Sequence, residues 1–179
     1  MWSSSHNTLW LPIAVCMFVI TCVLLLCGTA RADDTTVCGL PQSRIDAYQE
    51  RIAEHVTMIQ TTLRRYNVDE NFVWLAMIES GGDASAESEH GAAGLWQLTA
   101  ATASHYGCQD RHNVVCSTDA AARYLAKLLR DFNGDVWKAI VGYNMGGTNY
   151  RRSGKATNEA SALANTVTCL METYDGTDT

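Results

Sequence analysis

The segment 70–80 constrains the fold most, because a helix formed there would be apolar on every side. Seven consecutive apolar residues occupy positions 72–78. Asp69 is a typical N-cap residue, and the pair Gly81-Gly82 suits a helix end. A helix with no polar face has to be buried. The sequence therefore predicts a central helix over 70–80, with other helices packed around it.

The segments on either side show amphipathic helical spacing. Ser43 and Asp46 predict a capping box at the start of a helix before the central one. An apolar stripe then recurs at three- and four-residue steps, at Ile45, Tyr48, Ile52, Val56, Ile59 and Leu63. Further helices are predicted over 99–106, from Thr118 to Phe132, from Asp135 to Tyr143 and over 157–174. No long alternating run indicates a sheet, so we expect a mainly α fold with little or no sheet.

The first residues of the chain have the pattern of a secretory signal peptide. Residues 9–27 are almost wholly apolar, and Ala30-Arg31-Ala32 forms a small-x-small cleavage site. The n-region has no Lys or Arg, and about 20 apolar residues can span a bilayer, so a retained membrane anchor is the alternative. We expect residues 1–32 to be a signal peptide or an N-terminal membrane anchor. Residues 33–179 then form one exported domain, located in the periplasm or cell envelope.

Charge argues against one class of partner. Cleavage after Ala32 would remove Arg31 and no acidic residue, which leaves 12 Lys and Arg against 19 Asp and Glu. Binding to nucleic acid requires clustered basic residues that face the phosphates. The acidic balance therefore predicts no nucleic-acid partner.

The cysteines divide between the leader and the domain. Three of the seven lie in the leader, and Cys38, Cys108, Cys116 and Cys169 remain in the expected exported part. Four cysteines allow three pairings. We favour Cys108 with Cys116, which closes a short loop, and Cys38 with Cys169, which ties the start of the domain to its last helix. A metal site is the alternative, but no CxxC pair and no HExxH motif occurs, so no metal or cofactor is predicted.

Glu79 is the principal candidate for chemistry. It ends the apolar helix and precedes the glycine pair. Burial and the negative end of the helix dipole both disfavour a carboxylate, and both should raise its pKa. A general acid needs a raised pKa to hold its proton near neutrality. The alternative is a helix-terminal glutamate that points into solvent.

Several motifs follow in a fixed order. They are Glu79-Ser80, Ser88, the sequence GAAGLWQ at 91–97, and Gly142-Tyr143-Asn144 with Gly146-Gly147 nearby. Together with segments 102–107, 110–122 and 132–144, they resemble the lytic transglycosylases with a goose-type lysozyme-like domain, most closely the membrane-bound D type. The resemblance covers about residues 68–147 and implies a lysozyme-like helical fold.

The resemblance also implies residue roles. Glu79 corresponds to the single catalytic acid/base, and Tyr143 to a tyrosine whose hydroxyl assists at the reacting muramoyl residue. Asn144 supports the same corner of the site. Tyr143 could otherwise be a core aromatic residue.

Other positions correspond to the saccharide-binding part of the family site. Gln97 matches a glutamine that lines the groove, and Ser88 a serine that hydrogen-bonds near the reacting sugar. Gly91 and Gly94 would let the backbone approach the substrate closely, and Trp96 could stack on a sugar. Ser88 and Gln97 could instead be ordinary polar residues of a loop and a helix start.

The implied activity is cleavage of peptidoglycan glycan strands between N-acetylmuramic acid and N-acetylglucosamine, with a 1,6-anhydromuramoyl product. One alternative is a hydrolytic lysozyme of the same fold, which needs a second carboxylate such as Asp83, Glu87 or Glu89. The other is a non-catalytic glycan-binding subunit of a cell-envelope apparatus. The small size would suit an accessory protein of a secretion or pilus apparatus.

Overall fold

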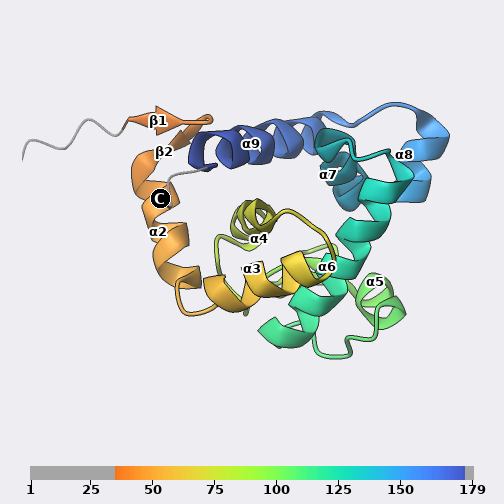
Figure 1. Ribbon diagram of the computed structural model, residues 1–179, viewed down its shortest axis with the longest axis horizontal. Coiled ribbons are helices and arrows are strands. Elements are labelled where there is room, and N and C mark those ends of the chain that lie inside the picture. Colours follow the sequence, from red (N-terminus) through yellow and green to blue (C-terminus); the bar gives the residue numbers. More distant parts are fainter. Residues whose placement is uncertain (1–34, 176–179) are drawn as a thin grey trace, which may run out of the picture. The chain divides into compact units, whose positions relative to one another are not determined.

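The computed structural model describes residues 35–175, and the predicted leader lies outside them. The elements in chain order are β1 (Thr36–Val37), β2 (Leu40–Pro41), α2 (Gln42–Ile52), α3 (Val56–Arg65), η1 (Glu70–Phe72), α4 (Val73–Ser80), β3 (Ala92–Ala93), β4 (Leu98–Thr99), α5 (Ala100–His105), α6 (Val114–Asp131), α7 (Val136–Met145), α8 (Gly147–Ser153) and α9 (Asn158–Tyr174). Helices dominate, and the strands form two antiparallel pairs (Figure 1). The prediction of a mainly α fold is confirmed. Within this part of the chain, no helix combines the length and apolar character needed to cross a membrane.

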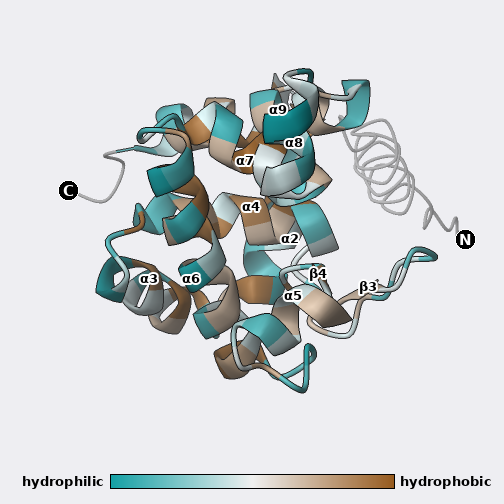
Figure 2. Ribbon diagram, turned by 90° about the vertical axis from the view of Figure 1, so that its right-hand side faces the viewer, coloured by the Kyte–Doolittle hydropathy of each residue, from teal (hydrophilic) through white to brown (hydrophobic). Residues whose placement is uncertain are grey.

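Helix α4 lies at the centre, as predicted. Its residues from Val73 to Met77 are all buried. The 3₁₀ turn η1 precedes it, and the Asp69 carboxylate accepts a hydrogen bond from the Asn71 backbone N–H at 2.8 Å. Helices α2, α3 and α9 contact α4 from three sides (Figure 1). Hydrophobic residues gather on α4 and the neighbouring stretch of α7 (Figure 2).

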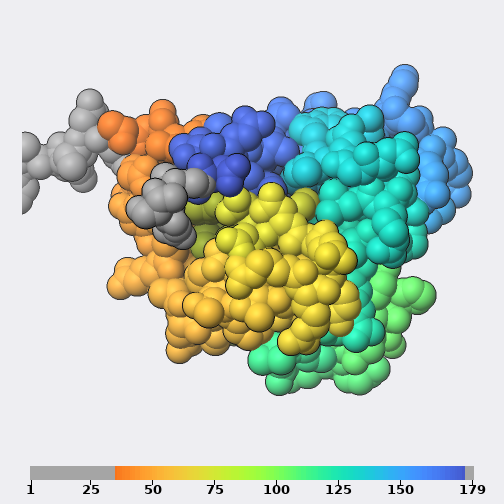
Figure 3. All heavy atoms as spheres, in the orientation of Figure 1, coloured from red at the N-terminus to blue at the C-terminus, as the bar shows by residue number. Residues whose placement is uncertain are grey.

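The apolar stripe before α4 is carried by two helices. The chain turns at residues 53–55 between α2 and α3, so the prediction of one continuous helix is wrong. The turn lets the stripe follow two sides of α4, and Ile45, Ile52, Ile59 and Leu63 are all fully buried. In the space-filling view, side chains of α3 close the face that appears open between the ribbons (Figure 3).

Helix α2 begins without the predicted capping box. Its first residue is Gln42, with Pro41 at the N-cap position and no side-chain cap there. Asp46 instead accepts a hydrogen bond from Nε2 of Gln42 at 2.8 Å. Ser43 therefore lies inside the first turn and does not start the helix.

The predicted starts of the later helices are mostly confirmed. Thr99, Asp135 and Thr157 each cap the following helix through a side-chain oxygen. Helix α6 begins earlier than the predicted Thr118, because the Asn113 side chain caps it by accepting from the Cys116 N–H at 3.0 Å. The short helix α8 was not predicted.

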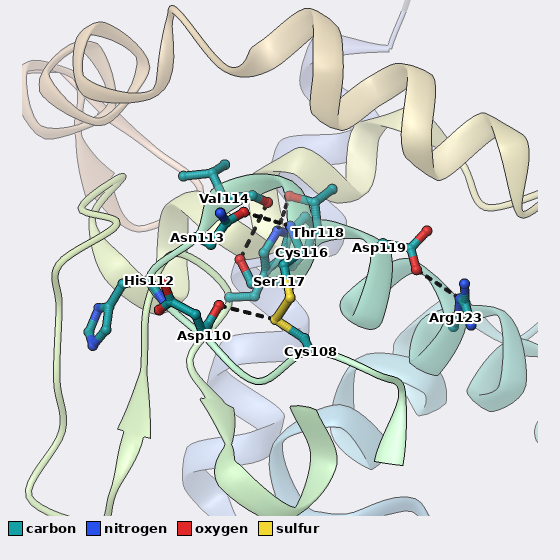
Figure 4. The surroundings of a disulfide bond; sticks show 11 residues. Cys108, Asp110, His112, Asn113, Val114, Cys116, Ser117, Thr118, Asp119 and Arg123 are labelled. Carbon is teal, nitrogen blue, oxygen red and sulfur yellow. Dashed lines mark hydrogen bonds and ion pairs between the residues drawn. A yellow bond between two sulfur atoms is a disulfide. The ribbon is translucent and has the colours of Figure 1, made fainter. Parts of the chain in front are cut away.

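Both favoured disulfides are present. Cys38 is bonded to Cys169, which ties the β1–β2 turn to α9. Cys108 is bonded to Cys116 and joins the loop after α5 to the first turn of α6 (Figure 4). The bridges therefore hold the chain at two separate places, one of them across 131 positions of sequence.

Candidate functional site

A cleft of about 340 Å³ lies where the end of α4 meets the β3–β4 hairpin, α6 and α7. Its walls come from five helices and the hairpin region, and the lining residues are Glu79, Ser88, His90, Ala92, Gln97, Leu98, Thr99, Thr102, Tyr124, Tyr143, Asn144 and Glu159. Five of the seven site residues predicted from the sequence belong to this set. The fold therefore brings together segments that are up to 80 positions apart in the chain.

Glu79 is the penultimate residue of α4, and its carboxyl group lines the cleft. Gly81 ends the helix in the left-handed conformation, with φ of 66°. Burial, followed by the negative charge of Glu159, raises the pKa of Glu79 from 4.5 to about 7. No cation among residues 35–175 forms an ion pair with it to oppose this shift. Glu79 can therefore hold a proton near neutral pH and release it at little cost.

Tyr143 reaches the cleft from α7. Its hydroxyl donates a hydrogen bond to the Trp96 carbonyl at 2.7 Å, and its ring lies against that of Tyr124 with centroids 5.3 Å apart. Burial raises the pKa of Tyr143 well above its ordinary value, and the charge of Glu79 adds to the effect. The hydroxyl is therefore a neutral, fixed group beside the acid.

Gln97 combines a place in the cleft wall with a role in the hairpin. Its φ of 45° is in the left-handed region, which is unusual for a residue other than glycine. The side-chain Nε2 donates to the carbonyls of Gly94 at 2.9 Å and Ala86 at 3.2 Å. These bonds fix the amide plane, and no group in the described residues donates to its oxygen. The amide oxygen can thus accept a hydrogen bond from a ligand.

Ser88 lies in the segment before β3 and lines the same cleft as Gln97. Its Oγ accepts a hydrogen bond from the Ala92 N–H at 3.0 Å, and its own N–H donates to the Ala92 carbonyl at 2.9 Å. The hydroxyl proton is then directed away from this backbone and can be donated to a ligand. Asn144, at the end of α7, is exposed and completes this side of the cleft.

Trp96 is not placed in the cleft. Its side chain is 0% exposed, and its indole Nε1 donates to Thr118 Oγ1 at 2.9 Å. A ring that is wholly enclosed cannot stack on a sugar, so Trp96 does not make the expected sugar contact. It supports the site through its packing and its backbone instead. Its backbone carbonyl holds the Tyr143 hydroxyl.

Gly94 also serves the fold and does not line the cleft. A Cβ atom at Gly94 would lie 1.9 Å from the carbonyl oxygen of Arg111. The glycine is required because the backbone of the loop after α5 passes directly against it. Gly91 has open space at the same position, and its carbonyl accepts a hydrogen bond from Arg111 Nη1 at 2.6 Å.

Glu159 is a functional candidate that no sequence motif indicated. It lies in the first turn of α9, lines the cleft and acts on the pKa of Glu79. The three loop carboxylates considered from the sequence do not line the cleft, and one of them, Glu87, pairs with His112 at 3.2 Å. An acidic residue in the first turn of a helix is an ordinary stabilising feature. The sequence around Glu159 therefore held no separate signal of a site.

The cleft lies within the part of the chain that matches a known protein family. The family model described as "Transglycosylase SLT domain" matches residues 57–165, a range that contains every residue lining the cleft. The chain is 33% identical, over 63% of its length and 58% of the relative's, to the "Putative tributyltin chloride resistance protein" of Alteromonas sp. (strain M-1).

Two further relatives are named as murein transglycosylases. The chain is 31% identical to the membrane-bound lytic murein transglycosylase D of Escherichia coli (strain K12), over 54% of this chain and 23% of the relative. It is 34% identical to the membrane-bound lytic murein transglycosylase F of Sodalis glossinidius (strain morsitans), over 49% of this chain and 21% of the relative. The chain thus spans from about a fifth to under two thirds of the length of these relatives. Because the family match extends over more than half of its residues, the chain belongs to the transglycosylase SLT domain family.

Proposed function

We propose that this chain is a peptidoglycan lytic transglycosylase, with Glu79 as its acid/base. It cleaves the β-1,4 bond between N-acetylmuramic acid and N-acetylglucosamine and leaves a 1,6-anhydromuramoyl end. The observation that carries the proposal is a buried carboxyl group with a pKa of about 7 in the cleft of an SLT domain. Two relatives with that activity in their names support the substrate class.

In the first step, protonated Glu79 donates its proton to the glycosidic oxygen. The bond from the muramoyl C1 to that oxygen breaks, and the N-acetylglucosamine end leaves as an alcohol. The N-acetyl carbonyl of the muramoyl residue stabilises the electron-poor C1. Burial of Glu79 and the charge of Glu159 disfavour its ionised form, which keeps the proton available for this step.

In the second step, ionised Glu79 accepts the proton of the muramoyl 6-hydroxyl as its oxygen attacks C1. The new C1–O6 bond closes the anhydro ring, and Glu79 returns to its protonated form. One carboxyl group therefore completes the cycle without bound water. An internal nucleophile is effective because attack within one molecule avoids the entropy loss of bringing in a second reactant.

The neighbouring side chains have binding and orienting roles in this scheme. The fixed Tyr143 hydroxyl faces the muramoyl residue, and the Gln97 amide oxygen accepts from a sugar hydroxyl or amide. Ser88 donates its hydroxyl proton, and Asn144 contacts the same saccharide from α7. Each of these residues lines the cleft that also contains Glu79.

Hydrolysis is the second candidate, and Glu159 is the observation that favours it. Most glycosidases use two carboxyl groups in one cleft, and the second group activates water or acts as the nucleophile. Asp83, Glu87 and Glu89 lie outside the cleft wall, so Glu159 takes their place in this alternative.

The products separate the candidates. The purified chain and its Glu79→Gln variant are incubated with peptidoglycan, and the soluble products are analysed by mass spectrometry. Anhydromuramoyl ends made only by the parent chain would support the proposal. Reducing muramoyl ends that disappear in Glu159→Gln would support hydrolysis, and binding without products would support a glycan-binding subunit.

The cellular setting is part of the same proposal. We infer that the chain acts in the cell envelope, since relatives are named as membrane-bound murein enzymes. We propose that the N-terminal segment attaches the chain to the membrane. We also propose that the chain serves a secretion or pilus apparatus. Fractionation of cells into periplasm, membrane and cytoplasm, with the mass of the recovered chain, tests the location and the cleavage after Ala32.

A further inference from the structure

A second cavity, of about 530 Å³, lies at the end of α3 beside α5 and α6. Its wall carries basic groups, which are Arg65, His105, Arg123, Lys127 and Arg130. We refer to these five residues as the basic pocket. The described residues that line this cavity include no aspartate or glutamate. This concentration is notable in a chain whose formal net charge is −6.

Helix α6 supplies three of these cations on one face. Arg123, Lys127 and Arg130 are spaced by four and then three residues, which places them above one another on a helix. Arg65 comes from the last turn of α3, which packs against α6, and His105 from the end of α5 (Figure 1). The pocket is therefore assembled from three helices and is a feature of the tertiary fold.

Two of the cations have no acidic partner. Arg123 pairs with Asp119 at 2.9 Å, and Lys127 pairs with Asp131, so these charges are partly neutralised. Arg65 and Arg130 form no ion pair with any residue in the range 35–175. Both are exposed. Their guanidinium groups are thus free to bind an anion from outside the chain.

Shared lining residues connect the basic pocket to the cleft that contains Glu79 through a third cavity. This cavity of about 310 Å³ shares Thr102 and Tyr124 with the cleft, and it shares His105 and Lys127 with the basic pocket. A row of tyrosine rings follows the same path. Tyr124 lies 5.3 Å from the ring of Tyr143 and 5.6 Å from the ring of Tyr106, which lines the basic pocket.

We propose that the basic pocket binds the carboxylates of peptides carried by the glycan strand that occupies the cleft. This inference rests on the proposed function, because the peptide reaches the pocket only when the strand is bound beside Glu79. Peptidoglycan stem peptides carry free carboxylates. Guanidinium groups bind carboxylates through two parallel hydrogen bonds, which fits the unpaired Arg65 and Arg130. The pocket then selects peptide-bearing strands over bare glycan.

The test compares three substrates made from the same strands. The first carries its peptides, the second carries peptides with amidated carboxylates, and the third has had its peptides removed. The kcat/KM of the full chain is measured on each, beside the double variant Arg65→Gln/Arg130→Gln. The control is Arg44→Gln/Lys155→Gln, which removes two exposed cations that line neither the cleft nor the basic pocket.

We expect the parent chain and the control to prefer the peptide-bearing strands by about three- to tenfold, as suits two exposed charge contacts. Arg65→Gln/Arg130→Gln should lose this preference and retain its kcat/KM on the other two substrates. Added salt should reduce the preference of the parent chain. Equal kcat/KM on all three substrates, or a preference that survives in the double variant, would overturn the inference.

Failure of the proposed function gives a different result. If the chain were a hydrolase, the same kcat/KM comparison would apply and only the product ends would differ. If it were a glycan-binding subunit, it would cleave none of the substrates, and Glu79→Gln would still report on the pocket by co-sedimentation with peptide-bearing and bare strands. Stronger retention on peptide-bearing strands, lost on amidation and lost with Arg65→Gln/Arg130→Gln, would support the pocket without the chemistry. Equal retention on both kinds of strand would overturn it.

Discussion

Glu79 links the protonation of a single residue to the stability of the fold. Its pKa is about 7 in the folded chain, against an ordinary value of 4.5. The folded state therefore binds more protons than the unfolded state between these pH values. The free energy of unfolding must fall as the pH rises through this window.

We predict that Glu79→Gln removes this pH dependence, because glutamine is neutral throughout. Above pH 7 the ionised carboxylate should destabilise the parent chain by about 3 kcal/mol relative to its protonated form. Urea unfolding of both proteins between about pH 4.5 and 8 measures the difference, since the other carboxylates contribute equally to both. Parallel curves would contradict the raised pKa.

Glu159 provides the second residue-scale prediction. Its negative charge raises the pKa of Glu79, so Glu159→Gln should lower that pKa. The initial step needs protonated Glu79, and kcat/KM should therefore begin to fall at a lower pH in the variant than in the parent. Glu54→Gln, which removes a carboxylate 80% exposed and outside the cleft, is the control. If kcat/KM of Glu159→Gln fell over the same alkaline pH range as that of the parent chain, the charge of Glu159 would have no effect on the pKa of Glu79.

The contrast between Glu79 and Glu159 marks the limit of prediction at the residue scale. Glu79 could be found because it lies at the end of an apolar helix and starts a series of ordered motifs. Glu159 comes from a helix more than 75 positions later, and its relation to Glu79 exists only after α9 packs beside α4. Trp96 illustrates the reverse case, since a motif position suggested a sugar contact and the packing encloses the ring.

At the scale of elements, the β3–β4 hairpin holds the cleft wall against the loop that precedes α6. Gly94 and Gly91 have nearly the same φ, 77° and 78°, but only Gly94 lies against another backbone. Substituting each glycine therefore separates the free-energy cost of a left-handed backbone from the free-energy cost of a steric clash. This pair offers a matched test of how the hairpin is supported.

We predict that Gly94→Ala is much more destabilising than Gly91→Ala. A left-handed alanine costs about 1–2 kcal/mol at either position. At Gly94 the methyl group would also overlap the Arg111 carbonyl, so the loop has to move and Gln97 loses its fixed partners. Denaturant unfolding and kcat/KM should show a larger loss in Gly94→Ala by both measures. Equal losses of stability and of kcat/KM in the two variants would mean that the loop after α5 moves aside at no cost in free energy.

Helix boundaries show what the sequence could and could not predict about elements. Capping residues such as Asp69 and Asp135 were sufficient to predict helix starts, because a cap is a local interaction. The turn at 53–55 was missed because the apolar spacing continues through it, and only contact with α4 on two sides explains the bend. The need for glycine at position 142 also depends on tertiary packing and not on local sequence. A Cβ atom added there would lie 2.8 Å from Phe132 and 3.1 Å from Leu128.

For the molecule as a whole, the two disulfides constrain the unfolded chain very differently. Cys38 and Cys169 are 131 positions apart, whereas Cys108 and Cys116 are 8 positions apart. Cross-linking removes more conformational entropy from the unfolded state when it closes a longer loop. The long bridge also ties the β1–β2 turn to α9, the helix that supplies Glu159 to the cleft.

We predict that Cys38→Ser/Cys169→Ser lowers the free energy of unfolding by about 5 kcal/mol, and Cys108→Ser/Cys116→Ser by about 2.5 kcal/mol. Urea unfolding of both double variants and the oxidised parent chain at one pH measures the order. The long-bridge variant should also lose activity at lower urea, because α9 is released from one end. The short-bridge variant, which only frees the loop after α5 from the first turn of α6, is its control. If the short bridge proved the more stabilising, chain entropy could not be the main contribution of these disulfides, and strain or packing in the folded state would have to account for the difference.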